Sequence, residues 1–255
     1  MNQSMIKFAT VGITVFGLIA GAYANVVDEI ERSFDVDSTS SLRLENVNGS
    51  VKISAWDKDV IKVLAVIKTD DQDDRDRISV EMTETSRGVS VETHYKKESS
   101  WGNHHSSGSV NYTIMVPVNA ELSSIDLVNG SLKIEGVTGE IKADLVNGSI
   151  KAFGLESDSE FNSVNGSIKI SYQKIGKDLN RIELDTVNGS IKLSLPENVS
   201  ASIDAETMHG SIKNDFGLKA NKNMFSGRSL KGDIGGGDIR ITLESVNGSV
   251  KILKN

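Results

Sequence analysis

One short phrase recurs along this chain of 255 residues, and its repetition limits the folds that the chain can adopt. The phrase reads Val-Asn-Gly-Ser, and most copies continue with a hydrophobic-Lys-hydrophobic triplet, although the copy at Val146 ends in Ala152. A fixed phrase at a near-constant spacing indicates a repeat architecture. The copies begin at Val47, Val128, Val146, Val164, Val187 and Val246, and Met208 begins a variant that reads Met-His-Gly-Ser.

The phrase combines turn chemistry with flanking strands. Asn-Gly is a strong tight-turn pair, because both residues tolerate positive φ and the Asn side chain can hydrogen-bond to nearby backbone. Ile182 and Leu184 alternate with charged residues before the turn, and Ile191 and Leu193 flank Lys192 after it. Period-two alternation indicates half-buried strands, so each repeat is predicted to be a strand, a corner and a second strand. The predicted corner residues are Asn48, Gly49, Asn129, Gly130, Asn147, Gly148, Asn165, Gly166, Asn188, Gly189, Asn247 and Gly248.

Two all-β folds fit this pattern. Successive corner positions from Asn129 to His209 are 18, 18, 23 and 21 residues apart, which suits either one coil of a solenoid or one hairpin of an antiparallel meander. In a meander, Asp185 would face Lys192 across the corner, and such opposite-charge pairs stabilise by roughly 0.2–1 kcal/mol. Charge pairing alone therefore favours the antiparallel β-hairpin meander.

The constancy of the corner favours the other fold. A meander does not need the same turn sequence in every hairpin. Stacked coils place each Asn on the copy below, where the side-chain amides can bond to one another. Because Val-Asn-Gly-Ser itself is repeated, rather than any generic turn, we predict a β-solenoid, β-helix-like, of short coils with Asn-Gly corners.

The first 24 residues are predicted to lie outside this fold. Lys7 precedes an apolar run over 8–22, and Ala22-Tyr23-Ala24 has the small-x-small pattern of a cleavage site. The run is shorter than the roughly 20 apolar residues that a membrane span needs. We therefore expect a signal peptide over 1–24, with an uncleaved anchor as the alternative, and no transmembrane span in a mature chain that begins near Asn25.

The composition agrees with an exported, all-β protein. The chain has no Cys, which excludes disulfides, thiol chemistry and anchoring through an N-terminal Cys. Its formal net charge of −7 disfavours nucleic acid and anionic membranes as partners. We expect one β-solenoid domain over 25–255, less regular over 25–120 and regular over 121–255, located in the periplasm, at the cell surface or outside the cell.

The less regular part contains two polar segments. The acidic run over 70–76 lacks the Asp-x-Asp-x-Asp-Gly order of an EF-hand, so we expect a solvated loop rather than a calcium site. A loop over 96–109 carries Trp101, His104 and His105, which are weak candidates for contact with a ligand. Tetrahedral zinc needs three or four converging ligands, so no metal and no cofactor is expected. Strands are predicted over 60–67, 78–82, 89–95 and 112–118.

The end of the chain carries a family resemblance. The stretch over 227–241 lacks the Gly-Lys-Ser/Thr of a phosphate loop, and its glycines are expected at corners where backbones approach closely. The VNGSIKI repeats and the closing segment GDIGGGDIRITLESVNGSVKI resemble the DUF4097 family of putative adhesins over roughly residues 34–252. The resemblance implies an exported bacterial β-solenoid with right-handed coils and an envelope or surface location. It brings no catalytic residues.

Two function classes remain. The first is a non-enzymatic envelope or surface interaction protein, adhesin-like or scaffold-like, with an unknown protein, peptide or polysaccharide ligand. The second is a polysaccharide-active β-helix enzyme, a lyase or hydrolase, which needs paired carboxylates in a cleft. Acidic residues such as Asp126, Asp144 and Asp185 recur with the repeat, whereas catalytic residues should break it. We therefore predict a protein that is not an enzyme and has no catalytic residues.

Overall fold

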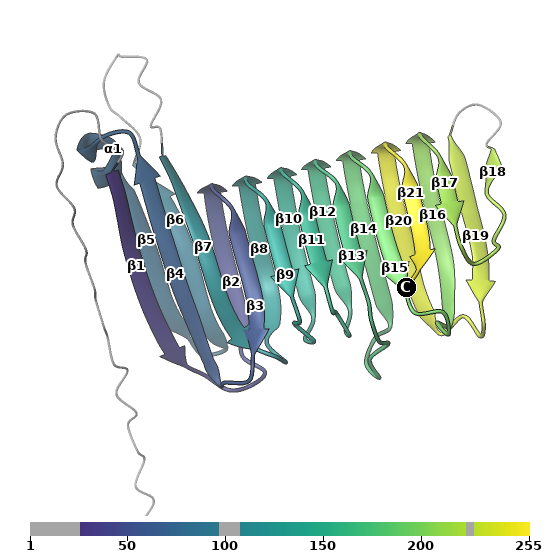
Figure 1. The fold of residues 1–255 in the computed structure, drawn as a ribbon, viewed down its shortest axis with the longest axis horizontal. Helices are drawn as coiled ribbons and strands as arrows, with labels where there is room; N and C mark the ends of the chain where they lie inside the picture. Colours follow the sequence, from purple (N-terminus) through teal and green to yellow (C-terminus); the bar gives the residue numbers. More distant parts are fainter. Residues whose placement is uncertain (1–25, 97–107, 223–226) are drawn as a thin grey trace, which may run out of the picture.

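The computed structural model describes residues 26–96, 108–222 and 227–255, and these form an almost entirely β-structure. Two sheets lie face to face, and their strands follow one another along the longest axis of the molecule (Figure 1). The sheets are rich in parallel pairs and do not close on each other. The all-β prediction is confirmed, and the strands predicted over 60–67, 78–82, 89–95 and 112–118 are present with slightly different bounds.

Sheet A has ten strands and sheet B has eleven. In spatial order, sheet A contains β1 (Val26–Asp35), β4 (Val60–Thr69), β7 (Gly108–Pro117), β3 (Val51–Trp56), β9 (Leu132–Glu135), β11 (Ile150–Phe153), β13 (Ile168–Ser171), β15 (Ile191–Leu195), β21 (Val250–Lys254) and β17 (Ile212–Asn214). Sheet B contains β18 (Asn221–Lys222), β19 (Arg228–Ile234), β16 (Ala201–His209), β20 (Ile239–Asn247), β14 (Arg181–Asn188), β12 (Ser159–Asn165), β10 (Ile141–Asn147), β8 (Glu121–Asn129), β2 (Ser41–Asn48), β6 (Gly88–Tyr95) and β5 (Ile78–Thr85).

Each repeat contributes one strand to each sheet. The strand before the corner lies in sheet B, the chain turns at Asn-Gly, and the strand after the corner lies in sheet A. Each strand pairs in parallel with its copy in the next repeat, so that Asn147 is the register partner of Asn165 and Lys151 is the partner of Lys169. Equivalent residues of neighbouring repeats therefore stack directly on one another.

The antiparallel meander is wrong for these repeats. Asp185 lies on β14 in sheet B and Lys192 lies on β15 in sheet A, so the two residues do not face each other across a strand pair. Asp185 has the stacked residues Asn162 and Glu244 as its register partners instead. The charge alternation that suggested hairpin pairing separates an acidic outer face on one sheet from a basic outer face on the other.

The core fills the space between the two sheets. Alternate side chains point inward from both strands of a repeat, and Leu184 and Leu193 are fully buried examples. The apolar residues of all repeats join into one continuous core. No single repeat could bury its apolar face alone, so the stacking of neighbours supplies the driving force for the fold.

The Asn side chains of the corners form a ladder. Asn165 donates its amide N–H to the side-chain oxygen of Asn147 at 2.9 Å, and Asn188 donates in the same way to Asn165 at 2.9 Å. The pattern continues to Asn48 at one end and Asn247 at the other, with distances of 2.8–3.0 Å. His209 is the register partner of Asn247 and takes the last position.

The corner glycines are needed mainly for close approach between repeats. A Cβ on Gly166 would lie 1.7 Å from the carbonyl oxygen of Gly148, and one on Gly148 would lie 1.7 Å from the Gly130 oxygen. Positive φ, which the turn argument expected throughout, occurs at Gly49 and Gly148. The stacked backbone therefore leaves no room for a side chain, whatever the local φ.

The spatial order of the repeats differs from their order in the sequence. The last repeat, β20–β21, lies between β14–β15 and β16–β17, and Figure 1 shows its yellow strands flanked by green ones. At the other end, the early strands β2 and β3 lie between β6–β7 and β8–β9. The chain thus returns to fill an inner position with its last repeat at one end, whereas at the other it moves outward from β3 to β4–β7 and then continues on the inner side at β8.

Antiparallel strands and charged groups cover the ends of the stack. Strands β1, β4 and β5 pair antiparallel at one end, and β18 and β19 do so at the other. Arg32 of β1 donates to the carbonyl oxygen of Met82 in β5 at 3.1 Å, which joins the two sheets. Arg75 forms an ion pair with Asp28 at the same end. Such devices protect sheet edges from pairing with other chains.

The acidic run over 70–76 is not only a loop. It contains the short helix α1 (Gln72–Asp76), whose N-cap Asp71 accepts the Asp74 backbone N–H at 2.8 Å. Sequence patterning missed this helix because it is a single turn, too short to show a 3.6-residue apolar period. Among the residues that the structure describes, no helix reaches the length and hydropathy that a membrane span requires.

Candidate functional site

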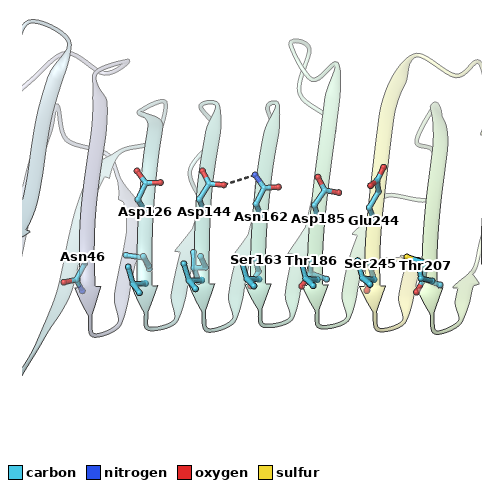
Figure 2. A pocket seen from close by; sticks show the side chains of 18 of the residues that line it. Asn46, Asp126, Asp144, Asn162, Ser163, Asp185, Thr186, Thr207, Glu244 and Ser245 are labelled. Carbon is cyan, nitrogen blue, oxygen red and sulfur yellow. Dashed lines mark hydrogen bonds between the residues drawn. The ribbon is translucent and has the colours of Figure 1, made fainter. Parts of the chain in front are cut away.

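A groove runs across the outer face of sheet B beside the corners. It crosses seven stacked strands, from β2 through β8, β10, β12, β14 and β20 to β16, and has a volume of about 830 Å³. Figure 2 shows side chains of the groove in rows that cross the stacked strands, for example the row from Asp126 to Glu244. The groove is therefore a product of the repeat, and its chemistry changes little from one end to the other.

An apolar row, here called the valine ladder, lines one side of the groove. It consists of the first residue of each phrase, which points outward because the residue before it on the strand points into the core. These side chains are 36–53% exposed, the largest value being that of Met208. A contiguous apolar row of this kind is a mark of an interaction surface. Its members are Val47, Val128, Val146, Val164, Val187, Val246 and Met208.

A row of acidic residues, here called the acidic ladder, lies two residues before the valines on the same face. Register pairs join each member to the next, and Figure 2 shows the central members side by side. Asn162 interrupts the charge and donates its amide N–H to Asp144 at 2.8 Å. In spatial order the members are Glu45, Asp126, Asp144, Asn162, Asp185, Glu244 and Glu206.

The ends of the acidic ladder are neutralised and its centre is not. Glu45 pairs with Arg43 at 2.5 Å, and Glu206 lies 3.7 Å from the Lys231 ammonium. Within the described residues, no salt bridge reaches Asp144, Asp185 or Glu244. The middle of the groove therefore holds carboxylates that attract a cation from outside the chain.

The pKa of Asp185 is raised by this arrangement. Burial raises its pKa from 3.8 to about 6, and the negative charges of Glu244 and Glu183 add to the increase. Its buried Oδ1 oxygen has no hydrogen-bond partner within the described residues. Stacking carboxylates one strand apart is unfavourable by itself, since like charges on neighbouring strands repel.

A row of buried Ser and Thr hydroxyls beneath the groove joins neighbouring repeats. Thr186 donates its hydroxyl to the Gly166 carbonyl oxygen at 3.0 Å, and Thr207 donates to Gly248 at 2.8 Å. Ser163 and Ser245 make the same kind of bond. These hydroxyls satisfy carbonyl groups of the adjacent repeat, so they hold the corners together and are not free to bind a ligand.

The opposite face of the molecule carries a row of lysines, here called the lysine ladder. Each member is the Lys that follows the phrase, and register pairs in sheet A stack them in the same order as the acidic ladder. Lys52 and Lys133 both reach Glu135, at 3.6 and 2.7 Å. The members are Lys52, Lys133, Lys151, Lys169, Lys192, Lys251 and Lys213.

The sites suggested by sequence lie elsewhere. Trp101, His104 and His105 fall outside the described residues. Within the described ranges, no cluster of three or more His, Cys, Asp or Glu could hold a metal ion, and this includes the acidic run over 70–76. The groove was missed, although the acidic or amide residue two positions before each Val was a visible signal.

The comparisons with known proteins agree with this architecture. The model of one protein family, described as Toastrack DUF4097, matches residues 37–253. The chain belongs to this family. Among curated proteins, no sequence matches this Toastrack protein.

Solved structures with a similar fold are distant in sequence. A "putative cell adhesion protein" from Clostridium sporogenes is 15% identical with a TM-score of 0.55, and the match covers 89% of this chain and 100% of that one. A "putative adhesin" from Bacteroides fragilis is 15% identical with a TM-score of 0.42, covering 89% and 97%. At this level of identity, the first structure supports a shared fold for the Toastrack protein and nothing further.

Replacing Asp185 with Asn is expected to stabilise the protein at neutral and higher pH. Because the folded-state pKa of about 6 exceeds the ordinary value of 3.8, this group favours folding most below pH 4, and that contribution is lost as pH rises through 6. A pKa difference of about two units corresponds to about 2.7 kcal/mol in the free energy of unfolding. Because Asp185 is about half exposed, solvent screening reduces the expected effect to about 1 kcal/mol.

Urea unfolding of both proteins across the pH range measures this difference. The stability curves of wild type and Asp185→Asn should separate above pH 6 and converge towards pH 4. Glu84→Gln, which removes an exposed carboxylate outside the groove, should follow the wild type throughout. A constant offset at every pH would contradict a titrating origin.

Proposed function

We propose that this protein is a non-enzymatic, exported interaction protein of the cell envelope or surface, adhesin-like or scaffold-like, and that the groove on sheet B binds a cationic partner. In this proposal, residues 1–24 are a signal peptide and residues 25–255 form one right-handed β-solenoid that acts as a rigid support. The observation that carries it is that the central carboxylates of the acidic ladder, which runs beside the valine ladder, form no salt bridge among the described residues.

The two ladders together favour a partner whose side chains are both cationic and aliphatic. A partner with ammonium or guanidinium groups on aliphatic stems can place its charges on the carboxylates and its stems on the valines. The cost of holding Asp185 ionised beside Glu244 would then be relieved on binding. A neutral sugar would gain little from this face, and an anion would be repelled.

We propose that the protein has no catalytic activity because the carboxylates of the acidic ladder occupy equivalent positions in their repeats. A hydrolase or lyase needs one pair of carboxylates with distinct roles, set apart by their surroundings. Here Asp126, Asp144 and Asp185 occupy the same position in their repeats, with Asn162 between the last two. The adhesin names of structural neighbours agree with a binding role. Depolymerisation of an acidic polysaccharide by the purified protein, lost on Asp73→Asn, would favour the enzyme instead.

Binding of a labelled oligolysine, followed by fluorescence polarisation at low ionic strength, tests the proposed function. The wild-type protein should bind oligolysine, and added salt should weaken the binding. Neutralising Asp144, Asp185 and Glu244 as Asn, Asn and Gln should weaken binding roughly tenfold, since each exposed pair contributes up to about 1 kcal/mol. Circular dichroism of the variant verifies that it remains folded.

A matched control removes the same charge elsewhere. Glu29→Gln, Glu84→Gln and Glu140→Gln replace three exposed carboxylates outside the groove, so the net charge changes equally. This variant should bind oligolysine as the wild type does. Equal weakening in both variants would mean that net charge alone attracts the probe, and the groove would not be the site.

A further inference from the structure

We infer that the partner in the groove is a second copy of this chain, bound through its lysine ladder. The inference rests on the proposed function, because it names the partner of the same groove. The two surfaces lie on the outer faces of opposite sheets, and each is built from one residue per repeat. One copy therefore presents the acidic groove while the next presents the lysines.

The first argument is the spacing of the charges. Both ladders have a pitch of one strand separation, about 4.8 Å, because both are formed by in-register strands. An extended peptide laid along the groove repeats its same-side groups about every 6.7 Å, and over six intervals it would drift by about 11 Å. A helix repeats about every 5.4 Å and would drift by about 4 Å. A second stacked sheet does not drift.

The second argument is the length of the lysine side chain. Along a strand, a valine and the carboxylate two residues before it are about 6.7 Å apart. A Lys that enters beside Val146 or Val187 can lay its four-carbon stem on the valine ladder and place its ammonium on the acidic ladder. Apolar and ionic contacts would then come from the same side chain at each rung that carries a carboxylate.

The third argument is that the central members of both ladders form no salt bridge within one copy, as far as the structure describes it. Lys151, Lys192 and Lys251 form none, like the central carboxylates on the other face. The ammonium of Lys169 lies 5.6 Å from the centre of the Phe153 ring. Two rows of opposite sign and equal pitch, each unpaired at its centre, are complementary to each other on neighbouring molecules.

This contact is heterologous, because the surface offered differs from the surface received. Such contacts leave a free groove at one end and a free lysine ladder at the other, so assembly continues as a stack of molecules. The matching strip spans about 29 Å over six intervals. That is small beside a standard protein interface, so a single contact should be weak and strongly weakened by salt.

Sedimentation velocity of the purified full chain tests the inference. At low ionic strength the average mass should rise with concentration above that of one chain, and salt should return it to that of one chain. Two charge-reversed variants test the two faces separately. One carries Asp144→Lys and Glu244→Lys in the groove, and the other carries Lys151→Glu and Lys192→Glu in the lysine ladder. Each variant alone should remain monomeric, while circular dichroism and thermal melting show that both stay folded.

The mixture of the two variants is the decisive sample. Each retains one native face, and the two altered faces carry charges of opposite sign, so an equimolar mixture should associate as an alternating stack in which neither variant contacts its own kind. A chain carrying all four substitutions regains opposite charges on its two faces and should associate again. Folded variants that do not pair in the mixture, or that associate alone as the wild type does, would overturn the inference.

The oligolysine experiment separates the two proposals. Wild-type protein that stays monomeric at low salt but binds oligolysine in the groove would keep the proposed function and exclude self-association, leaving a different cationic partner. Loss of both results would overturn both proposals. Self-association that is abolished only by the groove and lysine variants would support both.

Discussion

Replacing Gly148 with Val is expected to lower the free energy of unfolding by about 4 kcal/mol, because the new side chain meets two separate obstacles. Gly148 has a φ of +146°, a conformation that a β-branched residue adopts only under strain. Its Cβ would also lie 1.7 Å from the Gly130 carbonyl oxygen, which belongs to the hydrogen-bonded backbone of the adjacent repeat. Neither obstacle can be avoided by rotating a side chain.

Two further glycines separate these obstacles experimentally. Gly166 lacks the positive φ but would place a Cβ 1.7 Å from the Gly148 oxygen, so Gly166→Ala measures the collision alone. Gly217 has a φ of +78° with no atom near an added Cβ, so Gly217→Ala measures the backbone term alone. We expect about 2–3 kcal/mol for the first, and about 1 kcal/mol for the second.

Denaturant unfolding of the three variants provides the comparison. If Gly166→Ala is as stable as the wild type, close approach between repeats is not what requires glycine at the corners. If Gly217→Ala loses more stability than Gly166→Ala, local φ dominates, and the turn chemistry inferred from the sequence would be the better account.

The sequence predicts the repeat unit well because the unit is local. Alternation around Val187-Asn188-Gly189 sets two strands, and the corner between them depends on adjacent residues. The constancy of the Asn also indicates stacking, and Asn165 does bond to its copies on either side. Because only stacked repeats require the same Asn at every corner, the repeated Asn indicates the stacking from the sequence alone.

The spatial order of the repeats was not predictable in this way. The sequence of β20–β21 does not indicate that this repeat pairs with β14–β15 rather than following β16–β17, because all repeats offer almost the same strand edges. The choice depends on whether the long connection over 215–238 can cap β16 with β19 before it returns. Such a preference is a property of the whole chain, and no window of sequence contains it.

The groove could not be recognised before the strand topology was known. In the meander alternative Asp185 and Lys192 would neutralise each other across the corner, whereas the predicted solenoid does not require them to meet. The structure places them on opposite outer faces, so that one face is acidic and the other is basic. Charge patterns in repeats therefore need a strand topology before they can be interpreted as contacts.

Replacing Phe161 with Ala is expected to lower the free energy of unfolding by about 4 kcal/mol, because a fully buried aromatic ring is removed from a continuous core. Phe161 has Ala143 as its register partner in the preceding repeat, whereas its partner on the other side is Leu184. Ala152, the residue that departs from the repeated phrase, lies at the same level in sheet A as the partner of Ile170.

This register gives the irregular Ala152 a physical reason. Two alanines in one repeat leave volume for the Phe161 ring of the next, which is the balance that a close-packed interior requires. Ala152→Ile alone should therefore overfill the core and lower stability by about 1–3 kcal/mol. In the Phe161→Ala background, the same substitution should fill part of the cavity and raise stability.

A double-mutant cycle by denaturant unfolding tests this reason. We expect a coupling energy of about 1–3 kcal/mol, with the double variant more stable than Phe161→Ala. Ala65→Ile is the matched control, since Ala65 is also fully buried but lies on β4, outside the repeats. Its effect should simply add to that of Phe161→Ala. If Ala152→Ile also adds simply, the two positions do not share volume, and the departure at Ala152 must have another cause.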